Sequence, residues 1–187
     1  FFHADAAKRD AQESRGLGDV YKRQSLPSGG SILPFADWPK ELIKSLNGKY
    51  KLVNGGYEMD GTEISKLDEK EILNALKELQ NLGCNEIAIS SVFATVRGDM
   101  EQVAYDIIKK HSPNTNVSLS KNIGGMGLLE RENAALINAT LKPLAKEVVE
   151  SFEEFKSKLN FKCSMFFTKN DGTLIQSSEV IELPVLT

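Results

Sequence analysis

An apolar stripe at helical spacing predicts an amphipathic helix between residues 68 and 83. Asp68 is suited to cap its start, with Glu71 three positions later completing a box-like arrangement. Gly83 is suited to end it, because glycine readily adopts the left-handed conformation that follows many helices. The apolar members recur every three or four positions on one face: Ile72, Leu73, Leu76, Leu79 and Leu82.

The residues that follow alternate between strand and helix patterns. Residues 86–93 form a nearly continuous apolar run, which is typical of a strand covered on both faces. Asp99 begins a second helical pattern that ends before Pro113, and residues 117–120 form another short strand-like run. This order predicts a βαβ unit with a right-handed crossover and a parallel pair of strands. The inward positions expected on the second helix are Val103, Ile107 and Ile108.

Further elements are predicted on both sides of this unit. Residues 49–53 and 57–64 alternate in the manner of strands around a glycine-rich turn, so we expect a hairpin near the sheet edge. Residues 128–159 are helical in pattern, with Pro143 either kinking the helix or starting a second one. Residues 163–168 predict a third strand, and a strong turn signal follows it directly.

Two regions precede this body and differ from it in composition. Residues 1–24 mix charged and small residues without a period, and residues 15–24 resemble translated adapter sequence. We therefore expect a non-native or disordered tail, with a genuine flexible N-terminal arm as the alternative. Residues 25–48 predict a linker and a short helix, with Asp37 as its cap and Pro39 as its first residue.

Residues 49–187 form the predicted body, which we expect to be an internal piece of a larger protein. The chain begins without Met, and it ends in the apolar residues 184–187 with no polar tail. Where other parts of a parent protein would pack, apolar side chains should be exposed.

Composition narrows the class of protein. The chain has 41% hydrophobic and 26% charged residues and a formal net charge of -3, as in ordinary globular domains. Acidic and basic residues are interspersed, so neither a nucleic acid nor an anionic membrane is an expected partner. Its apolar runs are too short to span a bilayer, and its two widely separated cysteines suit neither a disulfide framework nor a zinc site. We expect a cytoplasmic protein.

Candidate chemistry lies after the predicted strands, because ligands of open parallel sheets bind beyond the carboxyl ends of the strands. Three segments have this place: residues 94–99, 121–127 and 169–173. In the second, Gly124, Gly125 and Gly127 predict either a tight turn or a loop that contacts phosphate through backbone N–H groups at a helix start. They match neither the Walker lysine pattern nor a full dinucleotide fingerprint.

The charged residues beside these loops also have two interpretations each. Glu130 and Arg131 either complement the dipole of the first helical turn or hold a polar substrate. Asp171 is either a turn residue or an exposed carboxylate able to bind metal or act as a base. Neither histidine, His3 nor His111, has the neighbours expected of a catalytic triad.

Several motifs resemble the hydantoinase/oxoprolinase family, which includes ATP-dependent 5-oxoprolinase and the N-methylhydantoinase A subunit. Residues 124–139 read GGMGLLERENAALINA, the most specific of these motifs. Residues 170–174 read NDGTL after a strand, and residues 55–61 read GGYEMDG ahead of the Leu-Asp-Glu helix start at 67–69. The weaker stretch at residues 33–39 also fits. In family order and spacing, the resemblance covers about residues 25–187.

The resemblance implies a three-layer α/β piece of an actin-like, sugar-kinase-like ATPase fold. It also implies that the parent protein opens a cyclic amide, such as 5-oxoproline or a hydantoin, by phosphorylating the carbonyl oxygen with ATP and Mg²⁺. Possible partners are a second hydantoinase-type subunit and further copies in an oligomer. Residues 49–187 would span the end of the N-terminal region and the start of the catalytic region.

The resemblance also assigns roles to individual residues, while the metal ligands stay unknown. The catalytic candidates are Asp171 and Glu130. The cofactor-binding candidates are Gly124, Gly125 and Gly127. The substrate-binding candidates are Asn170, Gly172, Arg131, Asn133 and Lys121.

Departures from the family pattern leave alternatives open. Many relatives carry His-Glu where this chain has Lys121-Asn122, and His where it has Tyr57. The glycine-rich phosphate loops of the family are not found in this sequence, so we expect the piece alone to be inactive. The alternatives for the parent are a non-catalytic actin-like scaffold or regulatory subunit, and an acetone-carboxylase-like subunit that activates a ketone.

Overall fold

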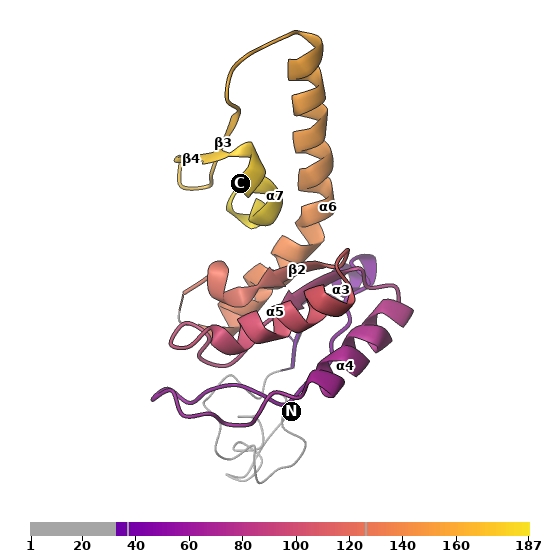
Figure 1. Cartoon of the computed structure of the whole chain (residues 1–187), viewed down its shortest axis with the longest axis vertical. Coiled ribbons are helices and arrows are strands. Elements are labelled where there is room, and N and C mark those ends of the chain that lie inside the picture. Colours follow the sequence, from indigo (N-terminus) through magenta and orange to yellow (C-terminus); the bar gives the residue numbers. More distant parts are fainter. Residues whose placement is uncertain (1–32, 37, 126) are drawn as a thin grey trace.

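The structure is a computed structural model that describes residues 33–36, 38–125 and 127–187. Helices and strands gather in one layered body, and the second half of a long helix, α6, projects from it (Figure 1). The predicted tail at residues 1–24, most of the linker and the Asp37 cap lie outside the described residues. The short helix α3 spans Lys40–Ser45, so Pro39 immediately precedes it and is not its first residue.

Helix α4 spans Glu69–Asn81 and buries Ile72 and Leu76 of the predicted stripe. The inclusion of Leu82 in that stripe is wrong, because Leu82 follows the helix and is 51% exposed. The Asp68 side chain accepts a hydrogen bond from the backbone N–H of Lys70 at 2.9 Å and so caps the helix. The expected box is wrong, because the carboxylate of Glu71 binds the backbone N–H of Asn54 at 3.0 Å. Gly83 has φ +85° after the helix, the left-handed value that favours glycine.

The predicted βαβ unit is present. Strand β1 (Glu86–Ile89) pairs in parallel with β2 (Asn116–Leu119), and helix α5 (Asp99–His111) connects them. Seven buried side chains form its core: Ile72, Leu76, Ile87, Ala104, Ile108, Val117 and Leu119.

Two details of the βαβ prediction are wrong. The first strand ends at Ile89, because the chain turns over residues 92–96. Val103 is 48% exposed, whereas Met100 and Ala104 are buried with Ile108. The inward face of α5 therefore follows an i, i+4, i+8 row, which places the bulky Val103 toward solvent.

The body has three layers, as the sequence predicted. Helices α4 and α5 pack with β1 and β2 around the core on one face of the sheet. On the other face, Asn138 of α6 donates a hydrogen bond from Nδ2 to Ser118 Oγ in β2 at 3.0 Å. Helix α6 spans Leu128–Lys158 with Pro143 inside it, so the alternative of a second helix starting at Pro143 is excluded.

The C-terminal segment forms its own small unit against α6. Strand β3 (Phe166–Thr168) pairs antiparallel with β4 (Leu174–Gln176), followed by helix α7 (Ser177–Glu182) and a 3₁₀ turn at Pro184–Leu186. Val149 of α6 packs against Ile175 and Val180. The third predicted strand is therefore shorter than expected, and it does not join the parallel sheet.

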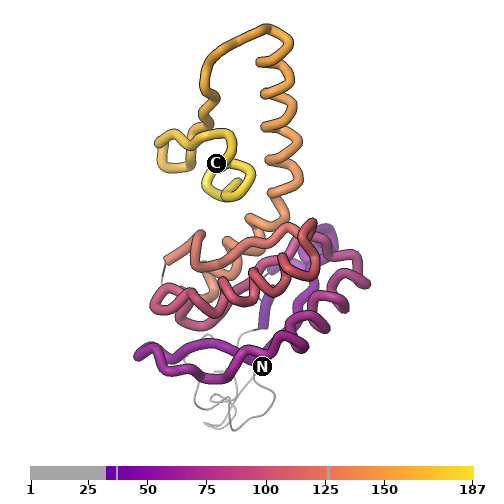
Figure 2. Tube along the Cα trace, viewed as in Figure 1, coloured from indigo at the N-terminus to yellow at the C-terminus, as the bar shows by residue number. Residues whose placement is uncertain are grey.

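The predicted hairpin between residues 49–53 and 57–64 does not form. Residues 49–53 are extended without forming a described strand, and a single antiparallel bridge joins Tyr57 to Glu63. The chain reverses at Gly61, whose N–H donates to the Glu58 carbonyl at 2.9 Å. Figure 2 traces these residues as a narrow loop that leads into α4.

Exposed apolar side chains are numerous on the projecting part of α6. The sequence predicts such side chains on residues 49–187. They include Leu144 (57% exposed), Phe152 (52%) and Phe155 (58%). Over the described ranges, no helix combines the length and hydropathy needed to cross a bilayer.

Candidate functional site

A buried polar network joins the carboxyl ends of the two parallel strands. Its centre is Glu101, which lies on the first turn of α5 and is 1% exposed. The Glu101 carboxylate accepts hydrogen bonds from Ser91 N at 2.8 Å, Ser120 Oγ at 2.6 Å and Lys121 N at 3.0 Å. One side chain therefore ties together the segments that leave β1 and β2.

Arg131 completes this network from α6 and is fully buried. Its Nε donates to Ser120 Oγ at 2.9 Å, and its Nη2 donates to the Ser91 carbonyl at 2.6 Å. Burial lowers the pKa of the Arg131 guanidinium, and the negative charges of Glu101 and Glu132 oppose that shift. In this geometry Arg131 organises backbone at the edge of the sheet.

The glycine-rich loop lies directly over Arg131. Arg131 Nη1 donates to the Gly125 carbonyl at 3.2 Å, and a Cβ on Gly124 would lie 3.2 Å from the Arg131 Cα. Gly124, Gly125 and Gly127 are exposed, while Met126 lies outside the described residues. The exposed Glu130 side chain folds back against Gly127 at the start of α6. A carboxylate in that place would repel a bare phosphate but could share a cation with it.

Lys121 connects this loop to the loop after β1. Its Nζ donates to the Gly98 carbonyl and to Gln102 Oε1, both at 3.0 Å. A Cβ on Gly98 would lie 2.5 Å from Lys121 Cδ, so this approach requires glycine. The amine is therefore engaged within the protein and is half-buried.

A second cluster surrounds Tyr57, in the loop before α4. The buried Tyr57 hydroxyl donates to Asp99 Oδ2 at 2.8 Å, and the Arg97 guanidinium lies 4.2 Å from the centre of the Tyr57 ring. Arg97 Nη2 also donates to Asp99 Oδ2 at 2.8 Å. Burial, followed by the bond to Asp99, raises the pKa of Tyr57. The bond from Tyr57 and then that from Arg97 lower the pKa of Asp99.

The third predicted segment does not join this site. Asn170, Asp171 and Gly172 form the turn between antiparallel β3 and β4, so they do not follow a strand of the parallel sheet. The Asp171 carboxylate accepts from Thr173 N at 2.9 Å and Thr173 Oγ1 at 2.6 Å, and these bonds lower its pKa. The expectation that all three loops meet at one sheet edge is wrong, because β3 belongs to another sheet.

Asn133 is also occupied within the protein. Its Oδ1 accepts a hydrogen bond from Trp38 Nε1 at 3.0 Å, which fastens the start of the described chain to α6. The structure thus brings together Lys121, Gly124, Gly125, Gly127, Glu130 and Arg131, and it leaves Asn133 and residues 170–172 apart from them.

The sequence interpretation missed the residue at the centre of the network, Glu101. A signal was available, because Glu101 shares a helical face with Ala104 and Ile108, which are three and seven positions later. An acidic residue on an apolar face needs buried partners. Across the described part of the chain, no group of three or more His, Cys, Asp or Glu residues is placed to hold a metal ion.

Comparisons with known proteins agree with the motifs. The profile described as "Hydantoinase/oxoprolinase N-terminal region" matches residues 38–112. The uncharacterized protein MJ0964 of Methanocaldococcus jannaschii is 25% identical over 185 residues, which is 97% of this chain and 27% of that protein. The chain therefore spans about a quarter of the length of this curated relative.

Two solved structures share the fold. The ATP-dependent caprolactamase from Pseudomonas jessenii matches with a TM-score of 0.62 and 22% identity, over 69% of this chain and 20% of that one. A nucleotide-free acetone carboxylase matches with a TM-score of 0.54 and 18% identity, over 79% of this chain and 23% of that one. The fold is accordingly a piece of the actin-like α/β architecture, and residues 38–112 match the N-terminal region of the hydantoinase/oxoprolinase family.

Proposed function

We propose that the protein carrying this chain is an ATP-dependent hydrolase that opens a cyclic amide of the 5-oxoproline or hydantoin type. The observation that carries the proposal is the match of residues 38–112 to the hydantoinase/oxoprolinase N-terminal region, together with a fold shared with an ATP-dependent caprolactamase, a name that denotes action on a ring amide. ATP would supply the phosphoryl group that activates the amide oxygen, and Mg²⁺ would balance the phosphate charge. ADP leaves when the phosphoryl group is transferred. One water then adds to the activated carbon and the ring C–N bond breaks, with the nitrogen taking up a proton. A second water cleaves the resulting acyl phosphate and releases phosphate.

Within this proposal the glycine loop contacts phosphate oxygens. Apart from its chain neighbours, no described residue lies within 4 Å of the place where a Cβ on Gly125 would lie, so the described part of the chain leaves the loop open on that side. The Glu130 carboxylate beside Gly127 is an oxygen ligand of the kind that Mg²⁺ accepts, which fits a cation between carboxylate and phosphate. Arg131 and Lys121 act as positioning residues, because Arg131 donates to the Gly125 carbonyl and Lys121 donates to the Gly98 carbonyl.

Asp171 is proposed as the second catalytic carboxylate, with Asn170 and Gly172 forming the turn that presents it. Its side chain is 62% exposed and its lowered pKa keeps it ionised at neutral pH. Asn170 donates from its backbone N–H to the Leu186 carbonyl at 2.8 Å, which fixes the turn against the C-terminal segment. We also propose that residues 49–187 span the end of the N-terminal region and the start of the catalytic region. The protein would act in an oligomer or with a second hydantoinase-type subunit.

Two other functions of the protein are each supported by a particular observation. The fold shared with acetone carboxylase over 79% of this chain favours activation of a ketone. The internal hydrogen bonds of Tyr57 and Lys121, at positions where many relatives carry other residues, favour a non-catalytic scaffold.

ATP turnover by the longer protein that contains this chain tests these proposals. Phosphate release would be measured with 5-oxoproline, with hydantoin, with acetone plus bicarbonate, and without substrate. Stimulation by one ring amide is the expected result. Stimulation by acetone alone would favour the ketone activity, and no stimulation by any of the three would favour the scaffold.

The chain offers a matched control for the role of Asp171. Asp60 occurs in the same Asp-Gly-Thr sequence and also accepts a hydrogen bond from the threonine two residues later, at 2.8 Å. Asp171→Ala should lower ring-amide-dependent turnover about 10²-fold or more, the usual loss for a general base, while Asp60→Ala should leave turnover near wild type. Equal, small losses in the two variants would show that Asp171 is only a turn residue.

A further inference from the structure

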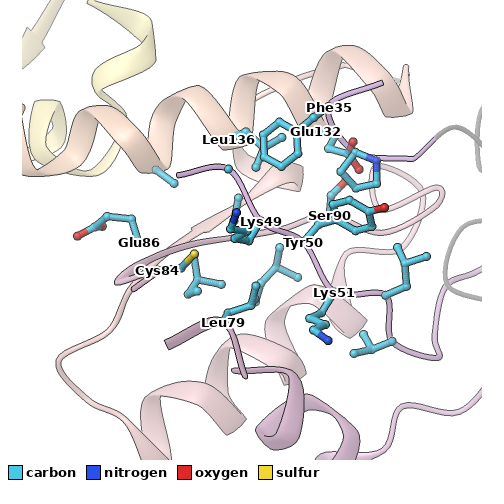
Figure 3. Close-up of a pocket in the computed structure, with 18 of the residues that line it drawn as sticks. Phe35, Lys49, Tyr50, Lys51, Leu79, Cys84, Glu86, Ser90, Glu132 and Leu136 are labelled. Carbon is cyan, nitrogen blue, oxygen red and sulfur yellow. The ribbon is translucent and has the colours of Figure 1, made fainter. Parts of the chain in front are cut away.

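The middle layer of the three-layer body is incomplete beside β1. A cavity of about 590 Å³ lies there, and residues 86–92 line it without interruption. Leu136 of α6 lines it from one helical layer, and Leu79 of α4 and Met100 of α5 line it from the other. Figure 3 shows Leu136, Leu79 and Ser90 around this space. Among the described strands, β2 alone pairs with β1, so the opposite edge of β1 has no strand beside it.

An extended segment forms the far wall of the cavity. Residues 46–56 line it. Near the start of β1, Asn47 Nδ2 donates to the Leu82 carbonyl at 2.9 Å. Beyond its end, a Cβ on Gly56 would lie 3.7 Å from Val92 Cβ. The segment therefore runs in the same direction as residues 82–92. Within it, no backbone hydrogen bond joins residues 49–53 to another described residue.

Two buried polar atoms on β1 and its continuation point to an absent partner. Among the described residues, Glu86 Oε2 and Ser90 Oγ are buried without a hydrogen-bond partner. Both residues line the cavity and are labelled in Figure 3. Buried polar atoms of native proteins are nearly always hydrogen-bonded, so their isolation is an observation separate from the cavity itself.

We propose that this cavity is an acceptor site for an extended polypeptide segment that lies outside these 187 residues and pairs with β1. Strands usually have about five or six residues, which suits the seven-residue wall at 86–92. The occupant should be apolar on both faces, because helices cover both faces of the sheet here. Its backbone would pair with β1 on one side and with residues 49–53 on the other, a form of strand addition.

The chain itself offers no segment of this kind. Residues 1–32 contain no run of five residues that is continuously apolar, as an occupant covered on both faces would need. The large exposed side chains on α6, such as Phe152 and Phe155, lie on a helix, whose backbone groups are already paired. The longer relatives, of which this chain matches about a quarter, have the additional length to supply a strand.

Hydrogen exchange on the whole 187-residue chain tests the acceptor site. The probe is the capped peptide acetyl-Lys-Val-Ile-Val-Ile-Thr-Lys-amide, and its control carries proline at the third and fifth positions, which removes two ladder donors. The expected result is slower exchange of the backbone amides of residues 86–92 with the first peptide and unchanged exchange with the second.

Variants of the chain distinguish binding at this site from nonspecific binding of the peptide. Ser90→Ala should weaken binding of the first peptide by about three- to tenfold, the usual effect of losing one hydrogen bond. Leu136→Glu should weaken it more than about tenfold, because it places a charge against an apolar occupant. Leu144→Glu is the matched control, since it lies two turns further along α6, outside the cavity lining, and should bind like wild type.

Each other outcome overturns the proposal. Absence of protection in a chain with native circular dichroism would show that the free edge does not accept a strand. Slow exchange of the amides of residues 86–92 without peptide, at every protein concentration, would show that the chain's own residues fill the cavity. Protection that grows with protein concentration, together with a dimer in sedimentation, would show that a second copy fills it.

Discussion

Replacing Glu101 by alanine tests whether the buried network holds the two strand ends together. The carboxylate accepts hydrogen bonds from Ser91, Ser120 and Lys121, and its residue is 1% exposed. Glu101→Ala leaves those donors without the carboxylate and removes one of the two negative charges that favour the buried Arg131 cation. Both effects act on the folded state, because water solvates all of these groups in the unfolded chain.

The expected cost follows from the burial of the network. Glu101 and Arg131 meet through the Ser120 hydroxyl, so removing the buried carboxylate leaves three donors and a buried cation less compensated. Removing one charge from such a buried arrangement typically costs about 3–5 kcal/mol. For a domain of this size each kcal/mol lowers Tm by about 2–4 °C, so the variant should melt about 6–20 °C lower. Glu101→Gln keeps the shape and one acceptor oxygen, so it should cost less, about 1–3 kcal/mol.

Urea unfolding at pH 7 measures these differences. Far-UV circular dichroism follows the helices, and the fluorescence of Trp38, the single tryptophan, follows its contact with Asn133 on α6. Glu154→Ala is the matched control, because Glu154 pairs with Lys158 on an exposed surface of α6, and such pairs contribute less than about 1 kcal/mol. If Glu101→Ala costs less than about 1 kcal/mol with an unchanged m-value, the network does not stabilise the strand ends and the reasoning is refuted.

Two further predictions concern the neighbouring loops. The pKa of Tyr57 is raised in the folded state, so the contribution of its neutral hydroxyl to stability is present below pH about 10 and is lost as pH rises further. The variant Tyr57→Phe cannot donate a hydrogen bond to Asp99, so it should lack this pH dependence in urea titrations between pH 8 and 11. A pH profile that is the same for both proteins would contradict it. Gly98→Ala should cost about 1–3 kcal/mol, since its Cβ would lie 2.5 Å from Lys121 Cδ, whereas Gly125→Ala should change stability by less than about 0.5 kcal/mol. Equal costs in thermal melts would show that the close approach at Gly98 is relieved without strain.

Local patterns were sufficient for the elements whose side chains pack within one helix–strand unit. The stripe from Ile72 to Leu82 predicted α4, and the alternation of strand and helix patterns predicted the parallel pairing of β1 and β2. The motif at residues 124–139 pointed to the family, which the profile match at residues 38–112 supports from another part of the chain. These signals are local because periodicity and capping depend on residues only a few positions apart.

Contacts between distant segments decided the remainder. Residues 163–168 read as one more strand of the sheet, but Phe166–Thr168 pairs with Leu174–Gln176, and this choice of partner removes Asp171 from the carboxyl edge of β1 and β2. The alternation in residues 49–53 predicts a strand, yet a strand needs a neighbouring backbone, and none of the described residues supplies one.

The candidate site shows the same division between local and tertiary information. The sequence by itself placed a glycine loop, Lys121 and Arg131 near a helix start, and these residues do lie together. Only the tertiary structure showed that Arg131 is buried and bound directly to the Ser91 carbonyl, 40 positions away. It also showed that Ser120 links Arg131 to Glu101. Sequence periodicity indicates which side of an element faces inward, but hydrogen bonds between polar groups inside a fold depend on where the layers meet.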